Sequence, residues 1–99
     1  MQKKENSLGL TLSYLEDLIR SKKNSSNSSY TTKLIKGDIN KVIQKVGEES
    51  TEVIIEATLK NKERTIYESA DLLYHLLVMW SKLNINLEEI AEELNKRKK

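Results

Sequence analysis

The sequence contains no proline along its 99 residues and only three glycines. Proline interrupts helices, so a chain without proline can form long helices. Proline and glycine are also common in tight turns, so this chain has few of the residues that favour β-turns. A chain of this length holds one hydrophobic core rather than two. We therefore predict a single all-α domain over residues 1–99, built as a bundle of four to five helices.

Apolar residues at three- and four-residue steps predict where the helices lie. Ser7 can cap the first helix, Asp38 can open a long helix, and Asn86 with Glu89 resembles a capping box before the last helix. The expected helices cover residues 7–23, 38–60, 62–83 and 87–96. Residues expected to face the core include Ile54 and Ala57, and Ile90, Ala91 and Leu94 near the end of the chain.

The segment between the first two long helices differs in composition. Residues 24–29 read NSSNSS, and these short polar side chains bond to their own backbone instead of forming a helix, so we predict a mobile loop. Thr31 or Thr32 can then cap a short helical turn. Gly37 is expected to end that turn by adopting a positive φ.

The helix over residues 62–83 is apolar nearly all round. A helix of this kind is typical of the centre of a bundle, where neighbouring helices cover every side. So short a chain has few helices to provide that cover. We therefore expect a second subunit to complete the bundle, in a homodimer or a higher homo-oligomer.

The charge, the cysteine content and the apolar runs of the sequence limit which partners and metal sites are expected. The formal charge is only +2 and basic residues interleave with acidic ones, which argues against a nucleic-acid partner. The absence of cysteine excludes a thiolate metal site. No signal-peptide core or run of about 18 apolar residues is present, so we expect no membrane contact and a cytoplasmic protein.

Carboxylates cluster beside the apolar faces of two helices. On the helix over 38–60 they fall within an arc of about 100°, with like charges four residues apart. Glu68 and Asp71 lie one turn apart on the most apolar helix, where an unpaired charge is unfavourable. A hard cation with oxygen ligands, Mg²⁺, would balance these charges; the alternative is a solvated acidic face. The carboxylates on the longer stripe are Glu48, Glu49, Glu52 and Glu56.

His75 extends the stripe of Glu68 and Asp71, and we interpret it as a hydrogen-bonding group on the substrate side rather than as a metal ligand. Basic residues border the acidic ones. Singly they are best explained as solvated side chains, or as charges that complement helix C-termini, but as a set they suit a polyphosphate. These basic residues are Arg20, Lys22, Lys23, Lys33, Lys36, Lys41 and Lys45.

Two motifs now resemble a family. EESTE at residues 48–52 and ESAD at 68–71 are similar to the EExxE and ExxD motifs of the all-α NTP pyrophosphatase (MazG-like) superfamily. The longer stretches SYTTKLIKGDINKVIQKVGEESTEVIIEA (29–57) and ESADLLYHLLVMW (68–80) resemble the phosphoribosyl-ATP pyrophosphatases of histidine biosynthesis. Lys22–Lys23 and the Ser/Asn run depart from the arginine–lysine pair and the proline common in that family.

The resemblance implies Mg²⁺-dependent cleavage of phosphoribosyl-ATP to phosphoribosyl-AMP and pyrophosphate by an all-α enzyme that is at least dimeric, here without the fused cyclohydrolase of many relatives. Metal-binding positions carry over to Glu48, Glu49, Glu52, Glu68 and Asp71. We expect Glu49, Glu52, Glu68 and Asp71 to hold the metal, with Glu48, Glu49 and Glu52 as catalytic residues. Either Glu48 or Glu52 would orient or deprotonate water. The expected substrate-binding residues are Lys22, Lys23, Ser29, Tyr30, Thr31, Lys33, Lys45, His75 and Arg97.

Two other functions fit the same residues. A house-cleaning (d)NTP pyrophosphatase of the same superfamily would use the same metal chemistry with a different base pocket. A helical dimerisation module without catalysis would explain the apolar helix and predicts no Mg²⁺ binding.

Overall fold

The computed structural model describes residues 7–26 and 28–98, and within them every regular element is a helix. The predicted all-α fold is confirmed. Predictions that concern residues 1–6, Asn27 and Lys99 lie outside the described part, including part of the predicted mobile loop and the start of the N-terminal segment. No helix in the described part is long and apolar enough to cross a membrane. The elements are α1 (Leu8–Ser21), the 3-10 helix η1 (Lys22–Asn24), α2 (Tyr30–Lys36), α3 (Ile39–Thr58), α4 (Lys62–Lys82) and α5 (Leu87–Asn95).

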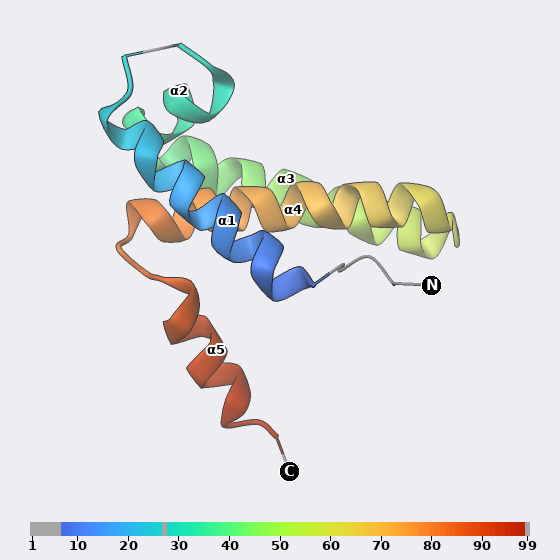
Figure 1. The fold of residues 1–99 in the computed structure, drawn as a ribbon. Helices are drawn as coiled ribbons and strands as arrows, with labels where there is room; N and C mark the ends of the chain where they lie inside the picture. The colour runs from blue at the N-terminus through green and yellow to red at the C-terminus, as the bar shows by residue number, and fades with distance from the viewer. Residues whose placement is uncertain (1–6, 27, 99) are drawn as a thin grey trace, which may run out of the picture.

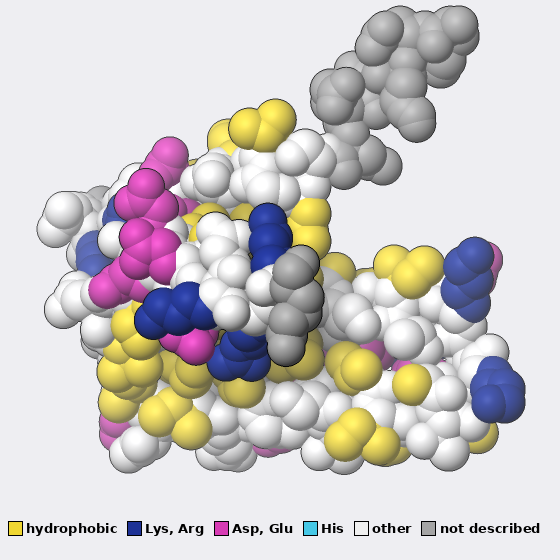
Figure 2. Space-filling model, turned by 90° about the horizontal axis from the view of Figure 1, so that it is seen from below, with side chains coloured by type: hydrophobic (Ala, Val, Ile, Leu, Met, Phe, Trp, Pro, Cys, Tyr) yellow, Lys and Arg dark blue, Asp and Glu magenta, His cyan; other side chains and the backbone are white. Residues whose placement is uncertain are grey.

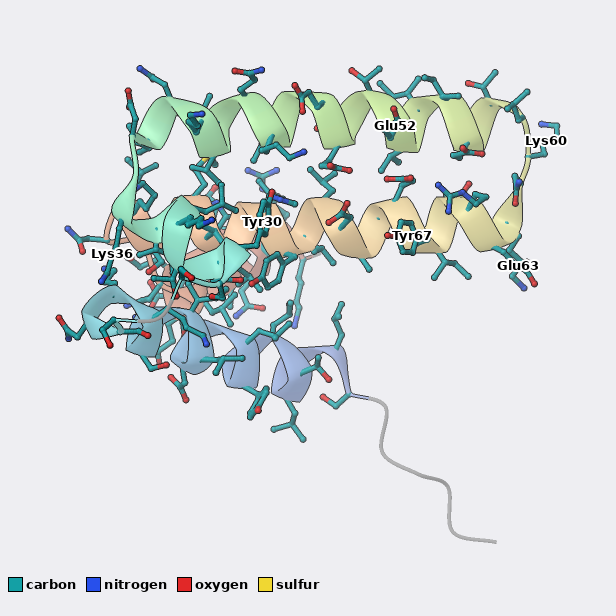
Figure 3. All side chains as sticks on the ribbon, turned by 90° about the horizontal axis from the view of Figure 1, so that it is seen from above. Tyr30, Lys36, Glu52, Lys60, Glu63 and Tyr67 are labelled. Atoms are coloured by element: carbon teal, nitrogen blue, oxygen red, sulfur yellow. The ribbon has the colours of Figure 1, made fainter. Side chains whose placement is uncertain are left out.

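The long helices α3 and α4 form an antiparallel hairpin, and α1 crosses α4 on the side away from α3 (Figures 1 and 3). Lys60 turns the chain between them at φ 58°, and Asn61 caps α4 by accepting a hydrogen bond from Arg64 N. Helices α1, α2 and α3 all contact α4, so its predicted central position holds for its second half, whereas Ile66 and Tyr67 in its first half are 59% exposed.

The core lies at one end of the hairpin, where α1 and α2 cover the second half of α4 (Figure 1). The other end extends beyond both covering helices. As a result, several apolar side chains predicted to face the core are exposed in the single chain; Ile54 is 64% exposed and Ala57 is also exposed. The buried apolar residues are Ile19, Leu34, Ile35, Val42, Leu77 and Val78.

Helix α5 projects away from the hairpin (Figure 1). Its start is fixed by the predicted capping box of Asn86 and Glu89, and Leu87 N donates to the Glu16 carboxylate on α1 at 2.8 Å. The expectation that Ile90, Ala91 and Leu94 point inward is met only in part within one chain, because Ile90 alone is half-buried. Ala91 is exposed and Leu94 is 58% exposed, because only α1 packs against this helix.

The short helix α2 is capped differently from the prediction. Ser29, not Thr31 or Thr32, is the N-cap, and its hydroxyl accepts a hydrogen bond from Thr32 N at 3.2 Å. Gly37 ends the helix at φ −87°, so the expected positive φ is wrong. Glycine is needed there for space, because an added Cβ would lie 2.9 Å from the Lys33 carbonyl oxygen.

Candidate metal centre

Three carboxylates from the two hairpin helices meet beside α2. Glu49 of α3 and Glu68 of α4 are buried, and Asp71 is partly buried one turn further along α4. Their positions follow from the helical repeat, since residues 68 and 71 lie on one face of α4 and α3 runs antiparallel beside it. The structure therefore brings together the carboxylate pair on α4 and one member of the acidic stripe on α3.

The electrostatics of this cluster are unfavourable without a cation. Burial raises the pKa of Glu49, and the neighbouring Asp71 and Glu68 carboxylates raise it further, while Lys45 opposes them. The Lys45 ammonium lies 3.6 Å from Glu49, but its side chain is 36% exposed and therefore screened by water. A cation among these oxygen atoms would remove the repulsion.

Arg64 balances the outer side of the cluster. Its guanidinium donates to Glu68 at 2.8 Å, lies 3.9 Å from Glu56, and stacks over the Tyr67 ring at 4.8 Å. Arg64 was not among the predicted site residues. Its four-residue spacing from Glu68 was the signal for this ion pair.

His75 closes the other side of the cluster. Its ring is 3% exposed, and a nitrogen of the ring lies within 4.8 Å of oxygen atoms of both Glu49 and Asp71. Both ring nitrogens are already engaged, however. Nδ1 donates to the Asp71 carbonyl oxygen at 2.8 Å, so in the neutral ring Nε2 accepts from the Tyr30 hydroxyl at 2.8 Å. These bonds favour an all-oxygen ligand set over a histidine ligand.

Helix α2 is tied to the cluster through tyrosines. The His75 ring makes edge-on contacts with Tyr30 at 5.9 Å and with Tyr74 at 5.8 Å between ring centroids. The hydroxyl of Tyr74 in turn hydrogen-bonds the Thr31 hydroxyl. The link between Tyr30 and His75, 45 residues apart, had no signal in the sequence.

Two predicted acidic site residues remain at the surface. Glu48 is exposed, accepts a hydrogen bond from Gln44 at 3.0 Å, and lies 3.5 Å from Lys45. The hydrogen bond from Gln44 lowers the pKa of Glu48 most; desolvation opposes it, and Lys45 lowers the pKa further. Glu52 is also exposed, one turn along α3 from Glu49, and within the described residues it forms no ion pair (Figure 3).

The remaining predicted substrate residues lie at different distances from the cluster. Lys33 is exposed on α2, and Lys22 and Lys23 lie in η1, where Lys23 donates to the Ser81 carbonyl oxygen at 3.1 Å. Arg97 follows α5 and pairs with Glu93 at 3.4 Å. Since α5 projects away from the hairpin, a single chain does not bring Arg97 to the carboxylates (Figure 1).

The donor set fits a hard divalent ion. Oxygen atoms of Glu49 and Asp71 lie within 4.8 Å of each other. Burial raises the pKa of Glu49 most, and the Asp71 and Glu68 carboxylates raise it further. Oxygen-rich sites of this kind favour Mg²⁺ or a similar ion over zinc. The cluster can therefore hold a metal ion between the two helices, next to an open surface lined by lysines.

Known proteins are similar to this chain over most of its length. A family profile described as phosphoribosyl-ATP pyrophosphohydrolase matches residues 12–98. The phosphoribosyl-ATP pyrophosphatase of Clostridium acetobutylicum is 47% identical over 87 residues, which cover 87% of this chain and 79% of that protein. The enzyme of the same name from Pyrobaculum aerophilum is 42% identical over 86 residues, which cover 86% of this chain and 92% of that protein.

Longer proteins match as well. The histidine biosynthesis bifunctional protein HisIE of Buchnera aphidicola subsp. Schizaphis graminum is 46% identical over 96 residues, covering 96% of this chain and 46% of that protein. The chain spans less than half the length of the bifunctional relatives that it matches.

Proposed function

This chain belongs to the phosphoribosyl-ATP pyrophosphohydrolase family, and from that premise we propose that it hydrolyses phosphoribosyl-ATP to phosphoribosyl-AMP and pyrophosphate. The reaction would serve histidine biosynthesis, as the names of its relatives indicate, and we place it in the cytoplasm. The observation that carries the proposal is the cluster of buried Glu49 and Glu68 with partly buried Asp71, in which the neighbouring carboxylates raise the pKa of Glu49 and a cation would relieve their repulsion.

We assign Mg²⁺ to this cluster, held by Glu49, Glu68 and Asp71 with Glu52 beside them. When bound, the ion would supply positive charge next to the triphosphate. This charge would offset the negative charge that develops on the departing pyrophosphate. The protein itself supplies the position of the ion, because Arg64 fixes Glu68 and the Asp71 backbone is held through His75.

The base is better assigned to Glu52 than to Glu48. A general base needs a free carboxylate oxygen and adequate basicity. Glu48 is engaged by Gln44 and Lys45 and has a lowered pKa, whereas Glu52 has no ion-pair partner among the described residues. In our proposal a Glu52 oxygen takes a proton from water as the water oxygen bonds to phosphorus. The bond from phosphorus to the bridging oxygen breaks, and pyrophosphate leaves.

Lysine and hydroxyl groups would bind the substrate oxygens. Lys45 lies between the acidic cluster and solvent, where it can pair with phosphate as well as with Glu49. Ser29, Tyr30 and Thr31 begin α2 next to it, and Lys33 is exposed on the same helix. We propose that these groups contact phosphate or ribose oxygens through charge-assisted hydrogen bonds.

The experiment measures pyrophosphate release by the full chain with Mg²⁺, offering phosphoribosyl-ATP and, separately, dNTPs. We expect release from phosphoribosyl-ATP that stops when EDTA removes the metal. Release from dNTPs but not from phosphoribosyl-ATP would instead indicate a house-cleaning enzyme. Calorimetry that detects no binding of Mg²⁺ or of a non-hydrolysable triphosphate would favour a module without catalysis.

We also propose that the protein is at least a homodimer. Its radius of gyration is 15.1 Å, against about 13 Å for a compact domain of this length. The hairpin end without cover exposes Ile54, Leu59, Ile66 and Tyr67, each by more than half. Figure 2 shows apolar side chains exposed in several groups on the side of the molecule seen from below. A second copy is the occupant that the apolar hairpin suits, because paired hairpins form a four-helix bundle.

Light scattering tests the assembly. We expect the mass of at least a dimer for the wild type and a shift toward monomer for Ile54→Glu. Asp17→Lys, at an exposed polar position of α1, should leave the mass unchanged. A wild-type monomer at micromolar concentration would contradict this part of the proposal. In an assembly, any contact of Arg97 with substrate would be made at the site of another copy.

A further inference from the structure

A row of hollows follows α2 and the first turns of α3, away from the carboxylates. The first, of about 260 Å³, is lined by Tyr30, Lys41 and Lys45 among others. The second, of about 320 Å³, shares Tyr30 and Lys41 with the first and extends to Gly37. The third, of about 610 Å³, also includes Gly37. Neighbouring hollows share lining residues, so the three lie side by side along α2. Lys45 of the first hollow lies 3.6 Å from Glu49 of the acidic cluster.

The third hollow is basic. It is lined by Lys23, Lys36 and Lys82, and we call it the lysine hollow. Within residues 7–26 and 28–98, none of these three lysines forms an ion pair with a carboxylate. Three ammonium groups therefore share one concave surface without balancing negative charge.

Backbone carbonyl groups hold these lysines in place. Lys82 donates to the carbonyl oxygens of Ile35 and of Gly37, the latter at 2.7 Å. Lys23 donates to a carbonyl oxygen at the end of α4 at 3.1 Å, and Lys36 donates to the carbonyl oxygen of Ser25. An ammonium group has three N–H donors, so each lysine keeps at least one for a ligand. Capping of helix C-termini accounts for the individual bonds but not for three cations around one hollow.

The distance from the acidic cluster restricts the ligand. Lys82 follows Asp71 by eleven residues on α4, which is about 16 Å along the helix axis. Figure 3 shows the same order along the molecule, with Lys36 at one end, Tyr30 further in and Glu52 beyond it. A ligand that fills the row would carry negative charge at both ends and a less polar part between, beside Tyr30 and Leu34.

We infer that the lysine hollow binds the single phosphate of phosphoribosyl-ATP, the one on the ribose that does not carry the triphosphate. This inference rests on the proposed function. The substrate carries a triphosphate on one ribose and a monophosphate on the other, with the adenine between them. With the triphosphate at the acidic cluster, the monophosphate lies at the lysine hollow and the base and sugars lie along the row.

The lysine hollow then determines substrate specificity. ATP and dNTPs end at the base and have no group to place among the three lysines. A substrate with the second phosphate gains charge-assisted hydrogen bonds that these nucleotides lack. Lys36 and Lys82 act through binding alone, and neither touches the bond that breaks.

Calorimetry with two product-like probes tests the inference, using the full chain with Mg²⁺. Phosphoribosyl-AMP carries the second phosphate and AMP does not. We expect the wild type to bind phosphoribosyl-AMP more tightly, and Lys36→Gln or Lys82→Gln to reduce that preference by about tenfold. The affinity for AMP should stay within about twofold in both variants. Lys62→Gln, at the other end of α4, serves as the control and should leave both affinities unchanged.

A purely structural role gives a different result. If Lys82 only holds the end of α2, Lys82→Gln weakens both probes equally, and the exposed Lys36 has no effect. Either outcome, or an unchanged preference in both variants, overturns the inference. Inorganic phosphate should compete with phosphoribosyl-AMP in the wild type and lose this effect in Lys36→Gln.

Different results would contradict the proposed function and the placement of the second phosphate. If the wild type releases no pyrophosphate from phosphoribosyl-ATP, the reaction is wrong, whichever probe binds. If turnover is present but the lysine variants keep the preference, only the placement of the second phosphate is wrong.

Discussion

Replacing Glu49 with glutamine should stabilise the metal-free protein while removing its activity. An oxygen of Asp71 lies within 4.8 Å of Glu49. At an effective dielectric constant of about 20, two unit charges at that separation repel by about 3.5 kcal/mol. Lys45 at 3.6 Å offsets part of this repulsion, reduced by its exposure to solvent. We therefore expect Glu49→Gln to raise the free energy of unfolding at pH 7 by about 1–2 kcal/mol.

The destabilising charge of Glu49 should also affect how the free energy of unfolding changes with pH. The folded-state pKa of Glu49 lies above its ordinary value of 4.5, mainly because of burial and then because of Asp71. Between these two pKa values the folded protein binds more protons than the unfolded chain, so the free energy of unfolding falls as the pH rises. Below 4.5 this destabilisation is absent. In Glu49→Gln this decrease of the free energy of unfolding with rising pH should be absent.

The assay is urea unfolding in EDTA from pH 4 to pH 8, at one protein concentration, for the wild type, Glu49→Gln and Glu63→Gln. Glu63 is exposed on α4 and supplies a control for the loss of one negative charge. Added Mg²⁺ should stabilise the wild type by binding to the folded state and should have much less effect on Glu49→Gln. A metal-free Glu49→Gln protein that is no more stable than the wild type at pH 7 would refute the repulsion that we infer.

Three further substitutions test other parts of the structure. Gly37→Ala should lower the free energy of unfolding by about 1–3 kcal/mol, because its Cβ would meet the Lys33 carbonyl oxygen at 2.9 Å. Gly47→Ala, with no atom within 4 Å of its Cβ, should raise that energy by about 0.5–1 kcal/mol, and urea unfolding that shows the same sign for both would contradict this reasoning. Tyr30→Phe should lower stability by about 1–2 kcal/mol by leaving Nε2 of buried His75 unpaired, and should slow pyrophosphate release; stability equal to the wild type would show that water replaces the hydroxyl.

The helices could be predicted from the sequence because their signals are local. The capping box of Asn86 and Glu89, the cap at Asp38 and the apolar period of residues 62–83 each depend on neighbours within one or two turns. The N-cap residue of α2 was harder to predict from the sequence. Ser29, Thr31 and Thr32 are all residues that favour the N-cap position, and the structure places Ser29 there.

Exposure could not be predicted in the same way. Periodicity identifies the apolar face of a helix but not whether the same chain covers it. Ile54 and Leu94 lie on such faces and are exposed, because the hairpin end extends past α1 and α2 and α5 projects from the bundle. The pattern is the same for a residue buried by its own chain and for one buried by another subunit.

The candidate site was predictable as a set of residue types and only partly as an arrangement. The spacing of Glu68 and Asp71 indicated a shared face, and the antiparallel hairpin brings Glu49 to it. The contact of Tyr30 with His75 and the position of Lys82 under α2 depend on how distant segments pack. No local pattern reports such contacts.

The most direct test of the proposed function compares the wild type with Asp71→Asn in paired measurements of Mg²⁺ binding and of pyrophosphate release from phosphoribosyl-ATP. Asp71 is a partly buried member of the cluster, and its replacement keeps the shape of the side chain while removing its charge. We predict that the wild type binds Mg²⁺ and releases pyrophosphate, and that folded Asp71→Asn loses most of both. A folded Asp71→Asn protein that releases pyrophosphate at nearly the wild-type rate would contradict the assignment of this cluster as the active site.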